Sequence, residues 1–141
     1  MMKKVAVIGT GIMAAGIAAG FIAQSTPVVI LGRSKEKADA CLDKALLLAN
    51  KIGLVGPNAQ KDASTLKAEQ LTGVLEEWSH WDQCSWVIET VAENLALKQQ
   101  VFQYLDGVVP PQIPIGSNSS GFPISKIAEG LKTAEIGRAH V

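Results

Sequence analysis

VAVIGTGIMA, residues 5–14, is the stretch of sequence that decides the fold of this chain. Its first four residues are apolar and predict a buried strand, and the glycines that follow predict a tight turn into a helix. Gly9 allows the turn, Gly11 lets the backbone approach a ligand, and Ala14 lets the helix pack on the strand. Because N–H groups at a helix start attract anions, the stretch predicts a site for a dinucleotide pyrophosphate.

The same stretch has two simpler interpretations. Lys3 and Lys4, followed by an uncharged run from Val5 to Ala23, resemble a signal peptide or a membrane span. A strand-to-helix turn can also exist without a ligand. The glycines interrupt the run early, and a second apolar strand, Val28–Leu31, follows it, so we favour the nucleotide-binding interpretation.

The composition limits the classes of partner. The 141 residues suffice for one domain, and the formal net charge of zero predicts no nucleic-acid or membrane partner. Cys41 and Cys84 lack the CxxC spacing, so we expect no metal site and a reduced, cytoplasmic location.

Strands and helices alternate along the chain at the spacing of parallel βαβ units. We therefore predict an α/β fold, a Rossmann-type doubly wound, mainly parallel sheet with helices on both faces. The expected strands are Val5–Ile8, Val28–Leu31, Trp86–Ile88 and Ile113–Ile115. The expected helices are Met13–Gln24, apolar nearly all round and hence buried, a Ser34-capped helix ending at Ile52, Thr65–Leu71, Leu95–Leu105 and Ile124–Leu131.

The end of the second strand predicts which dinucleotide binds. NAD-binding domains usually carry an acid there, which bonds the ribose hydroxyls. This chain has Gly32, Arg33 and Ser34, and such a turn would accept the 2′-phosphate of NADP. We therefore favour NADP over NAD, although Arg33 and Ser34 can equally be a solvated charge and a helix cap.

The chain resembles the N-terminal domain of the L-3-hydroxyacyl-CoA dehydrogenases. Three blocks carry the resemblance, which runs from Lys4 to about Leu131: VAVIGTGIM at 5–13, VIETVAENLALK at 87–98 and GSNSS at 116–120. It implies hydride transfer between NAD(P) and a 3-hydroxyacyl-CoA or related 3-hydroxy acid, within fatty acid metabolism. It also implies a homodimeric parent enzyme that binds an acyl-CoA.

The resemblance implies roles for single residues. Thr90 and Val91 would line the nicotinamide side, Glu93 and Lys98 would approach the nicotinamide ribose, and Ser120 would bond the substrate hydroxyl as a catalytic residue. The simpler interpretation is a helix start at Glu93 and an ordinary polar turn at 117–120. The full set of expected cofactor-binding residues is Gly9, Thr10, Gly11, Ile12, Met13, Gly32, Arg33, Ser34, Thr90, Val91, Glu93, Lys98, Ser117 and Asn118.

Other proteins with similar features remain alternatives. A β-hydroxyacid dehydrogenase of the 6-phosphogluconate type shares the glycine turn and an Arg-Ser turn for NADP. A non-catalytic dinucleotide-binding module is the alternative outside enzymes. The family's helical pair that touches coenzyme A would correspond to Lys44–Leu71, with Lys51 and Lys61 near the phosphates.

The end of the chain departs from the family. His140 lies where the family has its catalytic base, but no orienting Glu follows it. Translation of the string GAGATCGGAAGAGCACACGTC gives residues 135–141, and from its second base onward this string is a common sequencing adapter whose next triplet is a stop. We expect residues 1–134 to form the dinucleotide-binding domain and 135–141 to be a non-native tail. The helical C-terminal domain would then be absent, and this fragment inactive alone.

Resequencing the source locus tests the tail hypothesis. We expect native DNA to continue differently after Ala134, because the adapter string would have been joined to a truncated fragment. Recovery of codons 135–141 and the stop from native DNA would contradict it.

Overall fold

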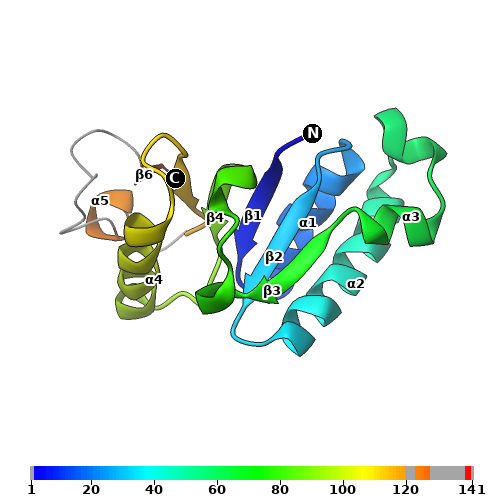
Figure 1. The fold of residues 1–141 in the computed structure, drawn as a ribbon. Coiled ribbons are helices and arrows are strands. Elements are labelled where there is room, and N and C mark those ends of the chain that lie inside the picture. Colours follow the sequence, from blue (N-terminus) through cyan, green and yellow to red (C-terminus); the bar gives the residue numbers. More distant parts are fainter. Residues whose placement is uncertain (1, 120–122, 128–138, 141) are drawn as a thin grey trace.

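A six-stranded sheet organises the protein, seen in a computed structural model that describes residues 2–119, 123–127 and 139–140 (Figure 1). The strands run in the order β3-β2-β1-β4-β5-β6, and every neighbouring pair is parallel. Their bounds are β1 Lys4–Ile8, β2 Val28–Gly32, β3 Leu71–Val74, β4 Cys84–Glu89, β5 Ile115–Ser117 and β6 Ala139–His140. Because β1 lies between β2 and β4, the direction of winding reverses there, as in a doubly wound Rossmann fold. The predicted fold class is confirmed.

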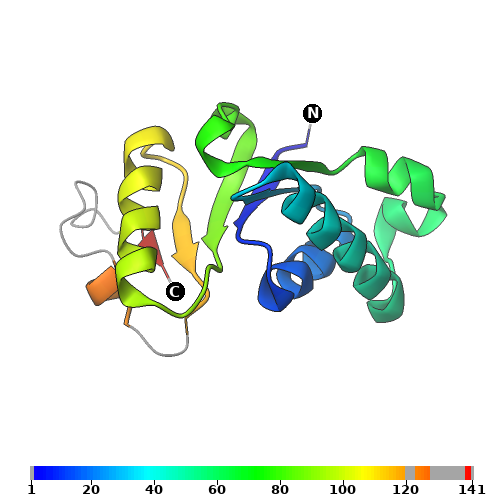
Figure 2. The ribbon, with the colours of Figure 1, turned by 90° about the horizontal axis from the view of Figure 1, so that it is seen from below.

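Helices cover both faces of the sheet (Figure 2). Val5 and Val7 of β1 point to the face covered by α1 and α2, whereas Ala6 and Ile8 point to the face covered by α4. Since both faces are buried, the central strands β1 and β2 carry continuous apolar runs, Val5–Ile8 and Val28–Leu31, rather than an alternating pattern. The helices are α1 Ile12–Ala23, α2 Lys35–Ile52, α3 Ala63–Ala68, α4 Leu95–Val108 and α5 Ile124–Ile127, and short 3-10 turns are η1 Gly56–Gln60, η2 Leu75–Glu77 and η3 Trp81–Gln83.

The apolar run from Val5 to Ala23 folds as β1, a turn and α1, not as one continuous helix. None of the helices within the described residues is long and apolar enough to span a bilayer. The expectation that this helix is buried holds for the side that carries its alanines and fails at its start. Its alanines pack closely on the sheet and α2, but Ile12 and Met13 are 76% and 58% exposed at its start.

Several element boundaries differ from the predictions by a few residues, and two of the differences have a clear local cause. The predicted helix Thr65–Leu71 ends at Ala68, and Leu71 instead begins β3, an edge strand too short and too exposed to show a pattern. The predicted strand Ile113–Ile115 starts later, at Ile115, because Pro114 has no N–H for the sheet. Of the predicted helix Ile124–Leu131, residues after 127 lie outside the described part.

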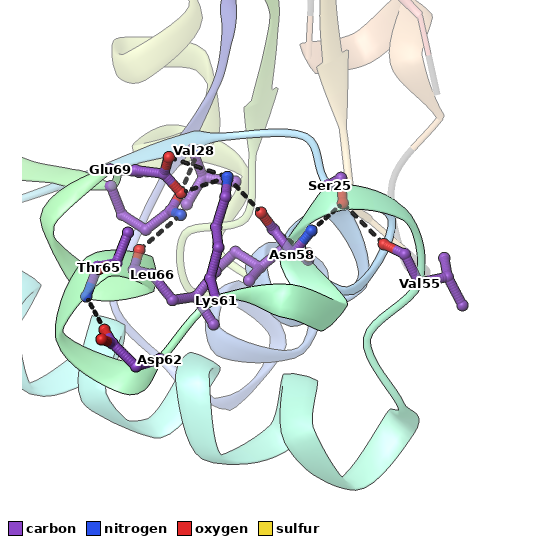
Figure 3. A network of polar contacts seen from close by, with 11 residues as sticks. Ser25, Val28, Val55, Asn58, Lys61, Asp62, Thr65, Leu66 and Glu69 are labelled. Atoms are coloured by element: carbon purple, nitrogen blue, oxygen red, sulfur yellow. Dashed lines mark hydrogen bonds and ion pairs between the residues drawn. The ribbon is translucent and has the colours of Figure 1, made fainter.

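A polar network joins the segment after α2 to the rest of the domain (Figure 3). The Lys61 ammonium donates to both carboxylate oxygens of Glu69, at 2.8 and 2.9 Å, and to Asn58 Oδ1 at 3.0 Å. Asn58 is buried, and its side-chain amide donates to the Ile22 carbonyl of α1. Lys61 is therefore engaged inside the fold, and its expected contact with a coenzyme A phosphate stays a prediction.

Replacing Gln70 tests how β2 is held at its start. Gln70 is buried, its side-chain oxygen accepts from Val28 N at 2.8 Å, and its amide donates to the Leu66 carbonyl at 3.0 Å. Gln70→Ala leaves a buried N–H without a partner, so we expect the free energy of unfolding in urea to fall by about 1–3 kcal/mol. The exposed Gln60→Ala is the control, and an equal effect of both variants would contradict the assignment.

Candidate functional site

A cleft of about 1000 Å³ opens at the carboxyl ends of β1, β2 and β4. This is the point of the sheet at which the strand order reverses, where open α/β sheets bind their ligands. The cleft walls come from the glycine turn, the end of β2, η2, the end of β4 and α4. The lining residues are Ile8, Gly9, Thr10, Gly11, Ile12, Met13, Leu31, Gly32, Arg33, Val74, Leu75, Glu76, Thr90, Val91, Ala92, Glu93, Leu97, Gln100, Val101, Tyr104 and Asn118.

The glycine turn lines the cleft, and its two glycines have different roles. Gly9 has φ +130°, and a Cβ there would lie 2.8 Å from the Thr90 carbonyl oxygen, so only glycine fits. Gly11 is the N-cap of α1, and a Cβ there would meet nothing within 4 Å. The space above Gly11 is therefore open to a ligand. Because Gly11 has no side chain to cap α1, the first N–H groups of the helix remain for an anion.

The end of β2 carries the turn expected to select the dinucleotide. Arg33 is exposed and lines the cleft, next to Gly32. A Cβ added to Gly32 would overlap the Thr10 methyl group. Ser34 Oγ accepts from Lys37 N at 3.2 Å and caps α2, as predicted, and Ser34 does not line the cleft. A contact of Ser34 with the cofactor stays a prediction.

A buried carboxylate organises the other end of the cleft. Glu89, the last residue of β4, is fully buried. Its Oε2 accepts from Lys98 Nζ and from Val91 N, both at 2.7 Å, and its Oε1 accepts from Ser117 Oγ at 2.6 Å. The Lys98 ammonium compensates the negative charge of Glu89, and the other two donors complete its hydrogen bonds, as a buried carboxylate requires.

Lys98 links this carboxylate to the cleft surface. Its ammonium is 2.7 Å from Glu89 and 3.5 Å from Glu93, and it donates to the Val91 carbonyl at 3.2 Å. Glu93 lines the cleft and also accepts from Ser119 Oγ at 2.9 Å. Asn94 caps α4 by accepting from Leu97 N, which sets the start of the helix that carries Lys98.

The structure brings together most of the predicted cofactor-binding residues. Eleven line the cleft: Gly9, Thr10, Gly11, Ile12, Met13, Gly32, Arg33, Thr90, Val91, Glu93 and Asn118. Lys98 and Ser117 are instead buried behind it, where they hold Glu89, so their expected direct contact with the cofactor stays a prediction. Ser120, the predicted catalytic residue, lies outside the described residues. His140 is placed by its backbone, which pairs with Gly116 in the sheet.

Sequence reasoning missed two groups of residues in this region. Glu89 was overlooked, although an acid ending an apolar strand and a lysine in the next helix are a detectable signal for a buried pair. The wall formed by Val74, Leu75 and Glu76 was not detectable, because β3 itself has no clear pattern.

Few charged side chains line the cleft, and neither of the two buried cysteines is among its lining residues. Arg33, Glu76 and Glu93 are the charged side chains among the described lining residues. Burial raises the pKa of the Cys84 thiol to about 11 and also raises the pKa of Cys41. Raised pKa values favour the protonated thiols near neutral pH.

Comparison with known proteins gives consistent matches. A family model described as "3-hydroxyacyl-CoA dehydrogenase, NAD binding domain" matches residues 4–140. The peroxisomal fatty acid beta-oxidation multifunctional protein MFP2 of Arabidopsis thaliana is 32% identical over 142 residues, which cover 95% of this chain and 18% of that protein. The fatty acid oxidation complex subunit alpha of Pseudomonas paraeruginosa is 33% identical over 138 residues, covering 95% and 18%.

A solved structure agrees with these matches. The 3-hydroxybutyryl-CoA dehydrogenase of Escherichia coli K12 superposes with a TM-score of 0.77 at 26% identity, covering 99% of this chain and 29% of that one. The chain thus spans less than a fifth of the length of these curated relatives. The family match includes residues 135–140, and the interpretation of 135–141 as a non-native tail stays a prediction.

Replacing Glu89 tests the buried network. Glu89→Gln removes the charge that compensates the Lys98 ammonium, so we expect a loss of about 3–5 kcal/mol in the free energy of unfolding, measured in urea. Glu93→Gln is the matched control, because Glu93 is partly exposed and 3.5 Å from the same ammonium, and it should cost less. Equal losses in the two variants would contradict the central role of Glu89.

Proposed function

This chain belongs to the 3-hydroxyacyl-CoA dehydrogenase family as its NAD-binding domain, and from this premise we propose that it binds a nicotinamide dinucleotide for oxidoreduction of a 3-hydroxyacyl-CoA or related 3-hydroxy acid. The observation that carries the proposal is the open space above Gly11 at the start of α1, within the cleft at the reversal of the sheet. A pyrophosphate fits this place, since it needs both close backbone approach and unpaired N–H groups.

Each part of the cleft has a proposed task. The first N–H groups of α1 bind the pyrophosphate, and Gly9 keeps the turn close to β4. The adenosine half lies over the end of β2, beside Arg33, and the nicotinamide half lies toward Thr90 and Glu93. When bound, the nicotinamide ring supplies the acceptor or donor of the hydride.

The remaining parts of the reaction are proposals from the resemblance. Ser120 would bond the substrate hydroxyl, and a general base would take its proton as the hydride leaves. The acyl-CoA substrate and a homodimeric parent enzyme follow from the same resemblance. A cytoplasmic location is supported by the two cysteines, which are buried and unbonded.

We further propose that the cleft prefers NADP. At Gly32 no carboxylate repels a 2′-phosphate, and the exposed Arg33 guanidinium beside it can pair with one. A competing arrangement is visible in the same cleft, because Glu76, after β3, also lines it and offers a carboxylate to a ribose. The two arrangements predict opposite cofactor preferences.

Fluorescence titration of the purified chain with NADPH and NADH, at matched ionic strength, tests both proposals. We expect tighter binding of NADPH, and a loss of about tenfold or more in NADPH affinity in Arg33→Ala, because one phosphate–guanidinium contact is removed. NADH affinity should change little in that variant.

Two further variants serve as controls for the titration. Gly11→Val fills the open space above the helix start and should abolish binding of both dinucleotides. Glu76→Gln should leave NADPH binding unchanged. Preferential NADH binding that is lost in Glu76→Gln would overturn the NADP preference, and binding of neither dinucleotide by the original chain would overturn the function.

A further inference from the structure

We propose that Thr10 and Gly32 act as one coupled pair that sets the dinucleotide preference of the cleft. In this arrangement the Thr10 methyl group occupies the space that an acidic side chain at position 32 would need. The inference rests on the proposed function and adds a second residue, Thr10, to the selection of the cofactor.

The contact between the two residues is specific to one methyl group. A Cβ built on Gly32 overlaps Thr10 Cγ2, closer than real Cβ atoms approach their neighbours. The same Cβ would lie 3.7 Å from Thr10 Cβ and 3.8 Å from Thr10 Oγ1, which are ordinary contacts. Gly32 also lacks the positive φ that Gly9 has, so its backbone conformation does not require glycine. The methyl group of Thr10 is therefore what excludes a side chain at position 32.

The position of Thr10 makes this exclusion hard to relieve. Thr10 lies between Gly9, which is fixed against the Thr90 carbonyl, and Gly11, the N-cap of α1. A β-branched side chain on such a backbone has few rotamers. Thr10 also lines both the main cleft and a second hollow of about 380 Å³ on the α2 side, whose wall includes Lys37 and Lys44.

The exclusion has a consequence for the cofactor. Gly32 ends β2, the place from which an acid reaches the ribose hydroxyls in NAD-binding domains. With the Thr10 methyl group where it is, the Cβ of such an acid would overlap it, and Arg33 is the first charged side chain beyond the strand. Because Thr10 disfavours an acid at position 32, no carboxylate repels a phosphate there. Thr10 therefore favours a phosphate at this position indirectly.

A stability cycle tests the coupling without any cofactor. Gly32→Ala adds only the Cβ, and Thr10→Ser removes only the methyl group while keeping the hydroxyl. We expect Gly32→Ala to lower Tm by about 4 °C or more in the original chain and to have little effect in the Thr10→Ser background. Equal losses of Tm in both backgrounds would overturn the coupling.

Titration of matched variants tests the effect on selection. We expect Thr10→Ser/Gly32→Asp to bind NADH about tenfold tighter than Gly32→Asp alone, and NADPH about tenfold weaker than the original chain does. If Gly32→Asp alone reaches the NADH affinity of the double variant, the proposal is wrong. If the coupling holds in Tm but the original chain binds no dinucleotide, the proposed function fails, and with it the selective role of the pair.

Discussion

The buried Glu89 carboxylate is the interaction on which the wall of the cleft formed after β4 and at the start of α4 depends. A fully buried charge is costly unless it is paired and hydrogen-bonded. Here the partners come from the loop after β4, through Val91 N, from α4, through Lys98, and from β5, through Ser117. One carboxylate thus holds together the strand, the helix and the loop that shape that wall, and it places the partly exposed Glu93 at the surface through the same ammonium.

The glycine turn depends on close packing rather than charge. Gly9 approaches the Thr90 carbonyl, and Gly32 approaches the Thr10 methyl group, so each glycine permits a contact with a residue from another part of the site. The first contact joins the glycine turn to β4, and the second joins it to β2. With the backbone bonds from Gly9 N to the Leu31 carbonyl and from Thr90 N to the Ile8 carbonyl, both 2.8 Å, these close approaches place the turn at the carboxyl ends of the three central strands, where the cleft opens.

The sequence predicted those elements of the site whose signals lie in adjacent residues. The apolar run before Gly9, the cap at Ser34 and the strand ending at Glu89 each depend on neighbouring residues, and the corresponding elements were found within a few positions. The edge strand β3 was missed, since its four residues, one exposed and three half-buried, show no hydrophobic period. The cleft wall that contains Glu76 follows directly after β3, so it was not predicted either.

The sequence by itself determined the α/β class, the glycine turn at the start of α1 and the family resemblance, because strand periods, turn glycines and helix caps are properties of adjacent residues. Only the tertiary structure decided that Lys98 turns inward to Glu89 and that Thr10 fills the space beside Gly32. These contacts join residues from different elements, and their distances depend on how the helices and strands pack. No local pattern contains that information.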